Sequence, residues 1–266
     1  EKQATDQGFK IYAAPTRGVN DSLSFRPDNP LVADLRVRQA LLHATNAKQV
    51  VETLFSANYP QATSVLASSA AGYVNLSDKL TFDQAKARQL LDEAGWKAGA
   101  DGIRVKEGQR LELTLLVSKK VLNDALIPIA KENWRQIGVL LKPQVVDFNA
   151  LMAQRKAGNY DLASFSTSTL NDPHDGVWDF YSSEAKESGY QNAEVDKLIN
   201  AGNAVLDIEK RKPIYHQLYK VLADDPPVIL LGYREILSAS SARVSGFKPD
   251  IYNGLTGSLP DVKIVK

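Results

Sequence analysis

The chain has 266 residues, of which 44% are hydrophobic and 24% charged, a balance typical of a folded globular protein. Lysine and arginine number 32 against 31 aspartates and glutamates, and the formal charge of +1 gives no electrostatic reason to expect nucleic acid or an anionic membrane as a partner. The absence of cysteine excludes disulfides, thiolate nucleophiles and cysteine-based zinc or iron–sulfur sites.

The apolar runs and the first residues of the chain bear on where the protein is located. No apolar run approaches the roughly 20 residues that a helix needs to span a bilayer. The opening residues EKQATDQG are polar and lack the pattern of an export signal. Because Glu1 stands where a starting methionine would, we expect a processed or cut piece of a longer chain.

The first hundred residues predict helices around an irregular loop. Asp34 is placed to cap a helix over 35–46, whose apolar residues share one side, and a second short helix is expected over 47–55. The stretch 56–79 is rich in small residues, tyrosine and proline without a period, which predicts a long surface loop. A third helix is expected over 83–95.

The middle of the chain alternates extended and helical patterns. Turn residues predict a hairpin over 100–109, which leads into a buried strand over 111–118. Two helices and two strands are expected in alternation after it, over 122–137, 139–146, 148–157 and 160–166. Connections of this length allow crossovers, so the order indicates a sheet with parallel pairs and helices on its faces.

The last part of the chain predicts two helices, over 194–205 and 208–223, then a strand over 228–233 and a loop-like tail from Gly246. Arg36 and Arg38 are expected to form structural ion pairs. The whole pattern places the chain in the α/β class, with a mixed sheet flanked by helices.

Seven phrases then occur in a recognisable order along the chain. They are LVADLRVRQALLHATN, FDQAKARQLLDEAGW, WRQIGVLLKPQVVDFNALMAQRKAGNYDLASFS, the Asp172-Pro173 pair, GYQNAEVDKLINAG, EKRKPIYHQLYKVLADDPPVILL and VSGF. In series they resemble the family 5 extracellular solute-binding proteins of bacterial ABC importers, which include oligopeptide, dipeptide and nickel receptors. The resemblance runs from about Asn20 to about Phe247.

Members of that family are about twice this length and close two lobes over a ligand like a hinged trap. The resemblance therefore implies one lobe, the carboxy-terminal one, of a two-lobed periplasmic-binding-protein fold (type II, family 5). We expect an extended hinge-proximal arm over 1–29, the ligand-binding lobe over 30–245, and a return segment towards the missing lobe over 246–266.

The resemblance also implies the function. It predicts the substrate-binding component of an ABC importer, which captures a small polar or peptide-like solute and delivers it to a membrane permease. The expected location is the periplasm or another extracytoplasmic site, with a cell-surface lipoprotein as one form. We expect a monomer without cofactor, metal or nucleic-acid partner.

Ligand contacts, by the same resemblance, cluster on the loop after the strand 160–166. The residues expected to contact the ligand are Thr167, Ser168, Thr169, Asn171, Asp172, His174 and Trp178, and Tyr73 is a candidate second wall. Peptide-binding members commonly carry an aspartate four residues before the proline of this loop, where its carboxylate pairs with a peptide's α-amino group. Thr169 occupies that position here. We therefore expect the ligand to be a small polar or cationic solute rather than a peptide bound through its free amino terminus.

Two other readings of this loop stay open. Asp172-Pro173-His174 resembles a phrase of the nickel receptors, although those proteins carry aromatic residues where this chain has Thr167 and Asn171. A purely structural reading makes Asp172-Pro173 a turn and His174 a loop histidine, because no second histidine lies at ligand spacing. Trp178 is as compatible with packing as with lining a cleft.

A hydrolase is the alternative from a different class. Asp172, His174 and Asp175, with serines nearby at 164, 166 and 168, offer the residue types of acid–base or serine chemistry. However, the sequence contains no Gly-x-Ser-x-Gly elbow, no His-Glu-x-x-His and no phosphate-binding glycine loop. We therefore expect no catalytic residues and no enzyme activity.

Overall fold

The computed structural model describes residues 1–16, 18–55, 59–167, 172–185, 188–233, 235–249 and 258–265. A five-stranded sheet, here called the main sheet, has the strand order β7-β6-β8-β2-β9. Its strands are β2 (Val19–Phe25), β6 (Glu112–Ser118), β7 (Leu140–Val146), β8 (Leu162–Thr167) and β9 (Val228–Gly232). β6 is parallel to β7 and β8, whereas β2 is antiparallel to β8 and β9. The predicted mixed sheet with parallel pairs is confirmed.

Two crossover helices build the parallel part of this sheet. α5 (Val121–Arg135) joins β6 to β7, and α6 (Phe148–Ala157) joins β7 to β8. α6 begins where the Asp147 carboxylate accepts a hydrogen bond of 2.8 Å from the Ala150 amide, and it ends at Gly158, whose φ of 74° suits a residue without a side chain. Both helices follow the predicted ranges closely.

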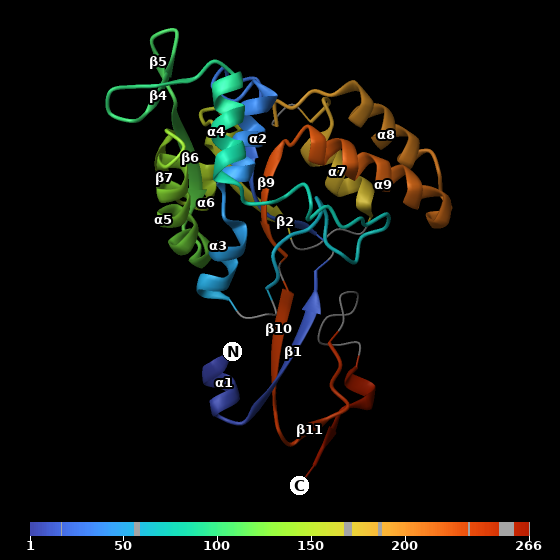
Figure 1. The fold of residues 1–266 in the computed structure, drawn as a ribbon. Helices are drawn as coiled ribbons and strands as arrows, with labels where there is room; N and C mark the ends of the chain where they lie inside the picture. Colours follow the sequence, from blue (N-terminus) through green and yellow to red (C-terminus); the bar gives the residue numbers. More distant parts are fainter. Residues whose placement is uncertain are drawn as a thin grey trace.

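The main sheet is covered on both faces. The first face packs against α5 and three further helices, which are α2 (Leu35–Ala44), α3 (Ala47–Leu54) and α4 (Gln84–Glu93). The second face packs against α6, α7 (Pro173–Tyr181), α8 (Ala193–Asn203) and α9 (Ile208–Asp224). Figure 1 shows α7, α8 and α9 grouped together beside β2 and β9.

Alternation along the strands explains the two-sided burial. Leu113, Leu115 and Val117 of β6 join the core of the first face, while Leu116 packs with Leu151 of α6 on the second face. All four side chains are fully buried or nearly so. A strand that is covered on both faces reads as a nearly continuous apolar run, which is the pattern ELTLLVS of β6.

The segment 1–29 differs from the expected arm. β2 lies inside the main sheet between β8 and β9, and Leu23 and Phe25 are at most 1% exposed. This strand therefore belongs to the lobe, and the lobe does not begin at residue 30. The strand could not be recognised in the sequence VNDSLSF, because its polar residues are not typical of a buried strand. In the structure they are buried with tertiary hydrogen-bond partners; for example, the Asn20 side-chain amide donates to the Ser64 carbonyl.

The long loop after α3 is irregular, as predicted, but it does not run over the surface. Among residues 59–83 the structure has no helix and no strand beyond isolated bridges at Gln61 and Leu66. Ala62, Val65 and Leu66 are at most 2% exposed. Backbone hydrogen bonds to other elements, such as the one from the Ala62 amide to the Leu231 carbonyl, make this burial tolerable.

A two-stranded ribbon leaves the main sheet. β1 (Phe9–Pro15) pairs antiparallel with β10 (Glu235–Ser241), and Figure 1 shows this ribbon extending away from the lobe, with α1 (Lys2–Asp6) beside it. Its apolar side chains Phe9, Ile236 and Leu237 are 41–46% exposed.

We had expected a loop-like tail from Gly246, but part of it has regular secondary structure. It contains the 3-10 turn η1 (Leu259–Asp261) and the strand β12 (Lys263–Ile264), which pairs with β11 (Val244–Ser245). Each of these strands has two residues, which is too short for a periodic pattern to reveal. The predicted hairpin after α4, by contrast, is confirmed by the small sheet of β3 (Lys97–Ala98), β4 (Arg104–Lys106) and β5 (Gln109–Arg110).

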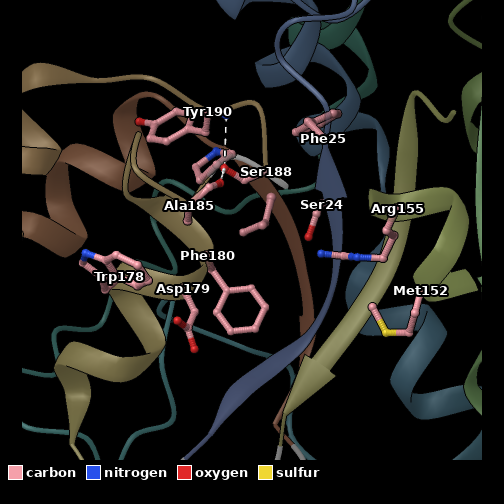
Figure 2. Close-up of a pocket in the computed structure, with 12 residues that line it drawn as sticks. Ser24, Phe25, Met152, Arg155, Trp178, Asp179, Phe180, Ala185, Ser188 and Tyr190 are labelled. Carbon is pink, nitrogen blue, oxygen red and sulfur yellow. Dashed lines mark hydrogen bonds between the residues drawn. The ribbon is translucent and has the colours of Figure 1, made fainter. Parts of the chain in front are cut away.

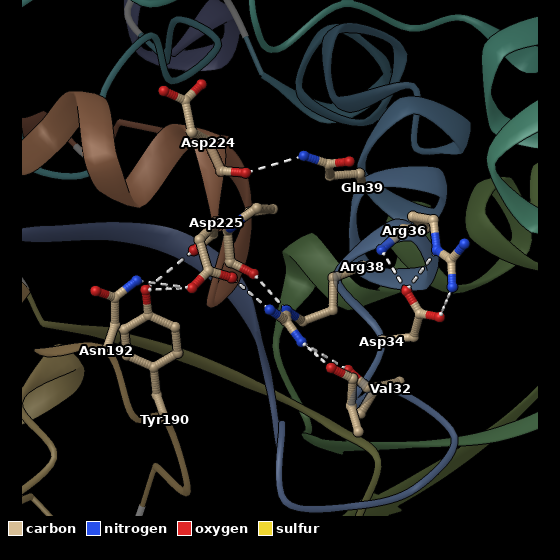
Figure 3. A network of polar contacts seen from close by, with 11 residues as sticks. Val32, Asp34, Arg36, Arg38, Gln39, Tyr190, Asn192, Asp224 and Asp225 are labelled. Atoms are coloured by element: carbon tan, nitrogen blue, oxygen red, sulfur yellow. Dashed lines mark hydrogen bonds and ion pairs between the residues drawn. The ribbon is translucent and has the colours of Figure 1, made fainter. Parts of the chain in front are cut away.

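Both arginines of α2 form ion pairs, as predicted. Arg36 pairs with Asp34 at 2.6 Å, and Arg38, which is buried, pairs with Asp225 at the end of α9. Figure 3 shows Asp225 at the centre of a network, because it also accepts hydrogen bonds from Tyr190 (3.0 Å) and Asn192 (2.9 Å). The network links α2 to the end of α9 and to the segment before α8.

No helix in the described part of the chain is long and apolar enough to cross a membrane.

His43, in the last turn of α2, is expected to make the stability of the fold depend on pH. The imidazole is 4% exposed, and its Nδ1 lies 2.8 Å from the Thr81 carbonyl oxygen, which can only accept, so Nδ1 carries a proton. Burial lowers the pKa of His43 below its ordinary value. Its stabilising contribution is therefore present above about pH 6.5 and is lost as the pH falls through the lower folded-state pKa.

We expect the free energy of unfolding to decrease between pH 7 and pH 5, and the His43→Asn variant, which keeps a donor near Nδ1, to show a flatter profile. Urea denaturation at a series of pH values measures both slopes. Equal slopes in the two proteins would show that His43 does not control this pH dependence.

Candidate functional site

One edge of the main sheet gathers the features that the sequence linked to ligand binding. Val19, the first residue of β2, is opposite Thr167, the last of β8, and Asp21 is opposite Gly232, the last of β9. β1 ends just before β2, and β10 begins just after β9. The ribbon therefore leaves the lobe at the edge where the loop after β8 begins, and we name this the ribbon edge.

An acidic and a basic side chain meet at the ribbon edge. The Asp21 carboxylate, in a residue that is 7% exposed, accepts a hydrogen bond from the Tyr59 hydroxyl. The Lys120 Nζ, just beyond the end of β6, lies 3.9 Å from Asp21 Oδ1. The Tyr59 ring stacks on Phe55 with centroids 4.1 Å apart and planes 15° apart, which fixes the direction of its hydroxyl.

Sequence reasoning did not find Asp21, Tyr59 and Lys120. A usable signal existed in the polar runs NDS at the start of β2 and SKK at the end of β6. Polar residues at strand ends can face a ligand together only if those strand ends lie at the same edge of the sheet, which depends on the strand order. The order β6-β8-β2 brings the end of β6 and the start of β2 to one edge here.

Hydroxyl groups form a second cluster near the ribbon edge. Thr63 Oγ1 lies 2.7 Å from the Tyr73 hydroxyl and 3.0 Å from the Tyr233 hydroxyl, which also accepts from the Thr63 amide at 3.1 Å. Burial raises the pKa of Tyr233 to about 12, so the phenol is neutral at physiological pH. Tyr73, our candidate for a second wall of the ligand site, is half-buried, and its hydroxyl is hydrogen-bonded to Thr63 within the same long loop.

Asp172 has a structural role in this arrangement. Its carboxylate accepts from the His174 amide at 2.8 Å and so caps α7, with Pro173 in the first helical position. Both carboxylate oxygens also accept from Arg211 of α9 at 2.6 Å. These hydrogen bonds hold the pKa of Asp172 below its ordinary value against the opposing effect of partial burial. This helix was not predicted, although Asp-Pro is a helix-start signal.

Of the other expected contact residues the structure describes three, and each lies in a different place. Thr167 ends β8 at the ribbon edge, while Ser168, Thr169 and Asn171 lie outside the described residues. His174 lies half-buried in the first turn of α7, and its Nδ1 has no hydrogen-bond partner within the described part of the chain. Trp178 instead lines a cavity near Phe25, at the opposite end of β2 from the ribbon edge.

Metal ligands are not grouped in the described ranges. Within those residues, no cluster of three or more histidines, aspartates and glutamates could hold a metal ion.

Comparison with known proteins identifies the family. The family model described as bacterial extracellular solute-binding proteins, family 5 Middle, matches residues 1–188. The chain therefore belongs to this family, which confirms the resemblance seen in the seven phrases.

Individual relatives agree with this assignment. The chain is 30% identical over 260 residues to the oligopeptide-binding protein AppA of Bacillus subtilis, covering 87% of this chain and 45% of that protein. It is 27% identical over 234 residues to the nickel-binding periplasmic protein of Escherichia coli, covering 83% of this chain and 42% of that protein. The chain thus spans about half the length of these curated relatives.

A solved structure confirms the fold. The structure of AppA from Bacillus subtilis in complex with a nonapeptide has a TM-score of 0.81 to this chain at 24% sequence identity, and it covers 99% of this chain and 55% of that one. The main sheet and its helices are therefore one part of a family 5 periplasmic-binding-protein fold.

Proposed function

We propose that this chain is the carboxy-terminal lobe of the substrate-binding component of a bacterial ABC importer, which captures a small polar or peptide-like solute in a cleft between two lobes. The observation that carries the proposal is the ribbon edge, where β1 and β10 leave the lobe beside the end of β8. Family membership and the half-length match to the relatives support a second lobe. Exposed apolar residues on the ribbon, including Phe9 and Ile236, are suited to contact it.

The chemistry of the ribbon edge supports the proposed ligand class. In the sequence, Thr167, Ser168, Thr169 and Asn171 supply neutral hydroxyl and amide groups at and after the end of β8. At the ribbon edge itself, Tyr59 and Lys120 accompany the Asp21 carboxylate. Such a mixed set of donors and acceptors suits a small polar solute better than an apolar one. Asp172, whose carboxylate is bound to Arg211, would act by holding the start of α7 in place.

Closure of two lobes over the solute would provide the signal that a membrane permease reads. The whole protein would then work in the periplasm or elsewhere outside the cytoplasmic membrane, as a monomer and without catalytic activity. Attachment to the cell surface by a lipid is part of this proposal for a source cell that lacks an outer membrane.

Calorimetric titration of the full-length protein tests the proposed function. The probes are short peptides, single amino acids, polyamines and a nickel–histidine chelate. We expect saturable binding of a peptide-like, polar or cationic probe. Binding of the nickel chelate alone would favour the nickel-receptor alternative, and hydrolysis of an ester or peptide probe would contradict a pure binding role.

Thr169 gives this proposal a test at one residue. In peptide-binding members an aspartate at the corresponding position pairs with the α-amino group of the peptide, and a hydroxyl cannot form that charge-assisted bond. The Thr169→Asp variant of the full-length protein should therefore bind dipeptides about tenfold more tightly, because one charge-assisted hydrogen bond contributes about 1.5 kcal/mol or more.

The matched control is the same dipeptide with an acetylated amino terminus, for which the gain should vanish. If the parent protein bound ordinary dipeptides tightly and Thr169→Asp improved nothing, Thr169 would not be the specificity-determining difference that we propose.

A further inference from the structure

A cavity of about 330 Å³ lies on the second face of the main sheet, between α6 and α7 (Figure 2). β2 begins at the ribbon edge with Val19 and contributes Ser24 and Phe25, its last two residues, to the lining of the cavity. The cavity is therefore separate from the proposed cleft, and its volume falls within the range of small-molecule sites.

The walls of this cavity are mainly apolar. Trp178 and Phe180 of α7 form one side, and Met152 of α6 and Val228 of β9 contribute elsewhere. The Tyr190 ring also lines it, while the Tyr190 hydroxyl donates to Asp225 at 3.0 Å and so is committed to the network of Figure 3. An apolar or aromatic body would replace water favourably against these side chains.

One cation faces this apolar space. Arg155, near the end of α6, is 6% exposed, and Figure 2 shows its guanidinium directed across the lining towards Ser24 of β2. A guanidinium remains charged at any physiological pH and presents parallel N–H donors that match a carboxylate. Its attraction for an anion is stronger beside apolar walls than in water, because the local dielectric constant is lower.

The charge of the lining distinguishes between anions. Arg155 is the only cationic residue among the described residues that line the cavity, and Asp179, which is exposed, adds a negative charge. Among these described lining residues, one cation beside one carboxylate suits a singly charged ligand better than a phosphate or a dicarboxylate.

We propose that this cavity binds a small monocarboxylate with an apolar or aromatic body. The carboxylate accepts hydrogen bonds from the Arg155 guanidinium and the Ser24 hydroxyl, and the body lies against Trp178 and Phe180. This site does not depend on the proposed transport function, because it uses none of the groups of the ribbon edge.

Tryptophan fluorescence of the 266-residue chain tests the proposal with phenylacetate as the probe. The chain has three tryptophans, of which Trp96 and Trp134 are at most 4% exposed and Trp178 lines the cavity. We expect a saturable change in emission with phenylacetate. Phenylacetamide, which has the same shape without the charge, should bind at least about tenfold more weakly.

Two variants probe the charges of the lining. Arg155→Met should weaken phenylacetate binding about tenfold and leave phenylacetamide binding unchanged. Asp179→Asn, at an exposed position whose substitution leaves the core intact, should bind phenylacetate at least as tightly as the parent.

Several results would overturn the proposal. They are the absence of any saturable change, equal affinity for phenylacetate and phenylacetamide, and weaker phenylacetate binding by Asp179→Asn. Unchanged phenylacetate binding by folded Arg155→Met would overturn it as well. If Arg155→Met does not fold, the comparison of the two probes and the Asp179→Asn titration decide the question.

Discussion

Replacing Arg211 by methionine is expected to lower the free energy of unfolding by about 2–4 kcal/mol, because a buried guanidinium that joins three helices would lose all its hydrogen bonds. Arg211 is 8% exposed and donates to both oxygens of Asp172 at the start of α7. It also donates to the Gly202 carbonyl of α8 at 3.0 Å and to the Tyr215 hydroxyl on its own helix, α9. The substitution leaves the Gly202 carbonyl without this donor.

Lys212→Met is the matched control for this prediction. Lys212 follows Arg211 on α9 and pairs with Glu209 at 2.6 Å, but both side chains are largely exposed, at 48% and 71%. Exposed pairs contribute little, so the control should change stability by less than about 1 kcal/mol. Denaturant unfolding measures both variants, and equal losses would show that the Arg211 contacts do not hold the helices together.

The acid limb of the stability profile gives the Arg211 prediction a second readout. Because Arg211 lowers the pKa of Asp172, this carboxylate contributes stability that is present above about pH 4 and lost as the pH falls through its folded-state pKa. Removing Arg211 should therefore flatten the profile in that window.

Trp134→Ala is expected to be the most destabilising single change, with a loss of about 3–5 kcal/mol. Trp134 of α5 is fully buried in the core of the first face of the main sheet. Its indole N–H donates to Thr45 Oγ1 at 2.9 Å, at the end of α2. Truncation to alanine removes a large buried ring and leaves a cavity that the neighbouring helices cannot fill completely.

Trp134→Phe separates packing from hydrogen bonding at the same position. Phenylalanine keeps much of the ring volume, and Thr45 still donates to the Leu41 carbonyl at 2.7 Å after the indole is removed. The expected loss is about 1–2 kcal/mol. Urea denaturation compares the two variants, and a phenylalanine variant as unstable as the alanine variant would mean that the hydrogen bond, and not packing, is the main contribution of Trp134.

The sequence predicted elements well wherever local signals and burial agree. α6 has a capping aspartate, an apolar side and a terminal glycine, and its predicted range matched the structure. The strand β6 and both crossovers could be predicted for the same reason. The mixed sheet followed from their order in the chain.

Elements whose polar residues are buried against partners distant in the sequence could not be predicted. β2 was missed because Asn20 and Asp21 are satisfied by Ser64 and Tyr59, 44 and 38 residues away in the chain. The long loop was expected at the surface because its irregular composition does not reveal its backbone contacts with β9. Tertiary pairing of this kind is not encoded in any local pattern.

The candidate site shows the same division. Asp172 was expected either to contact the ligand or to form a turn, and it is the N-terminal cap of α7, whose pairing with Arg211, 39 positions later, could not be predicted. Asp21, Tyr59 and Lys120 come together only because three strand ends and a loop meet at the ribbon edge. Trp178, which we expected beside the ligand loop, lines a cavity at the other end of β2.

Hydrogen–deuterium exchange of the full-length protein tests the central claim most directly. The measurement compares the free protein with the protein saturated by whichever peptide, polyamine, amino acid or nickel chelate binds most tightly in calorimetry. Our account predicts slower exchange of amides at the ribbon edge, within 18–22, 59–63, 118–121 and 167–174. Protection confined to 24–25, 152–155 and 178–190, or to segments of the other lobe alone, would contradict it.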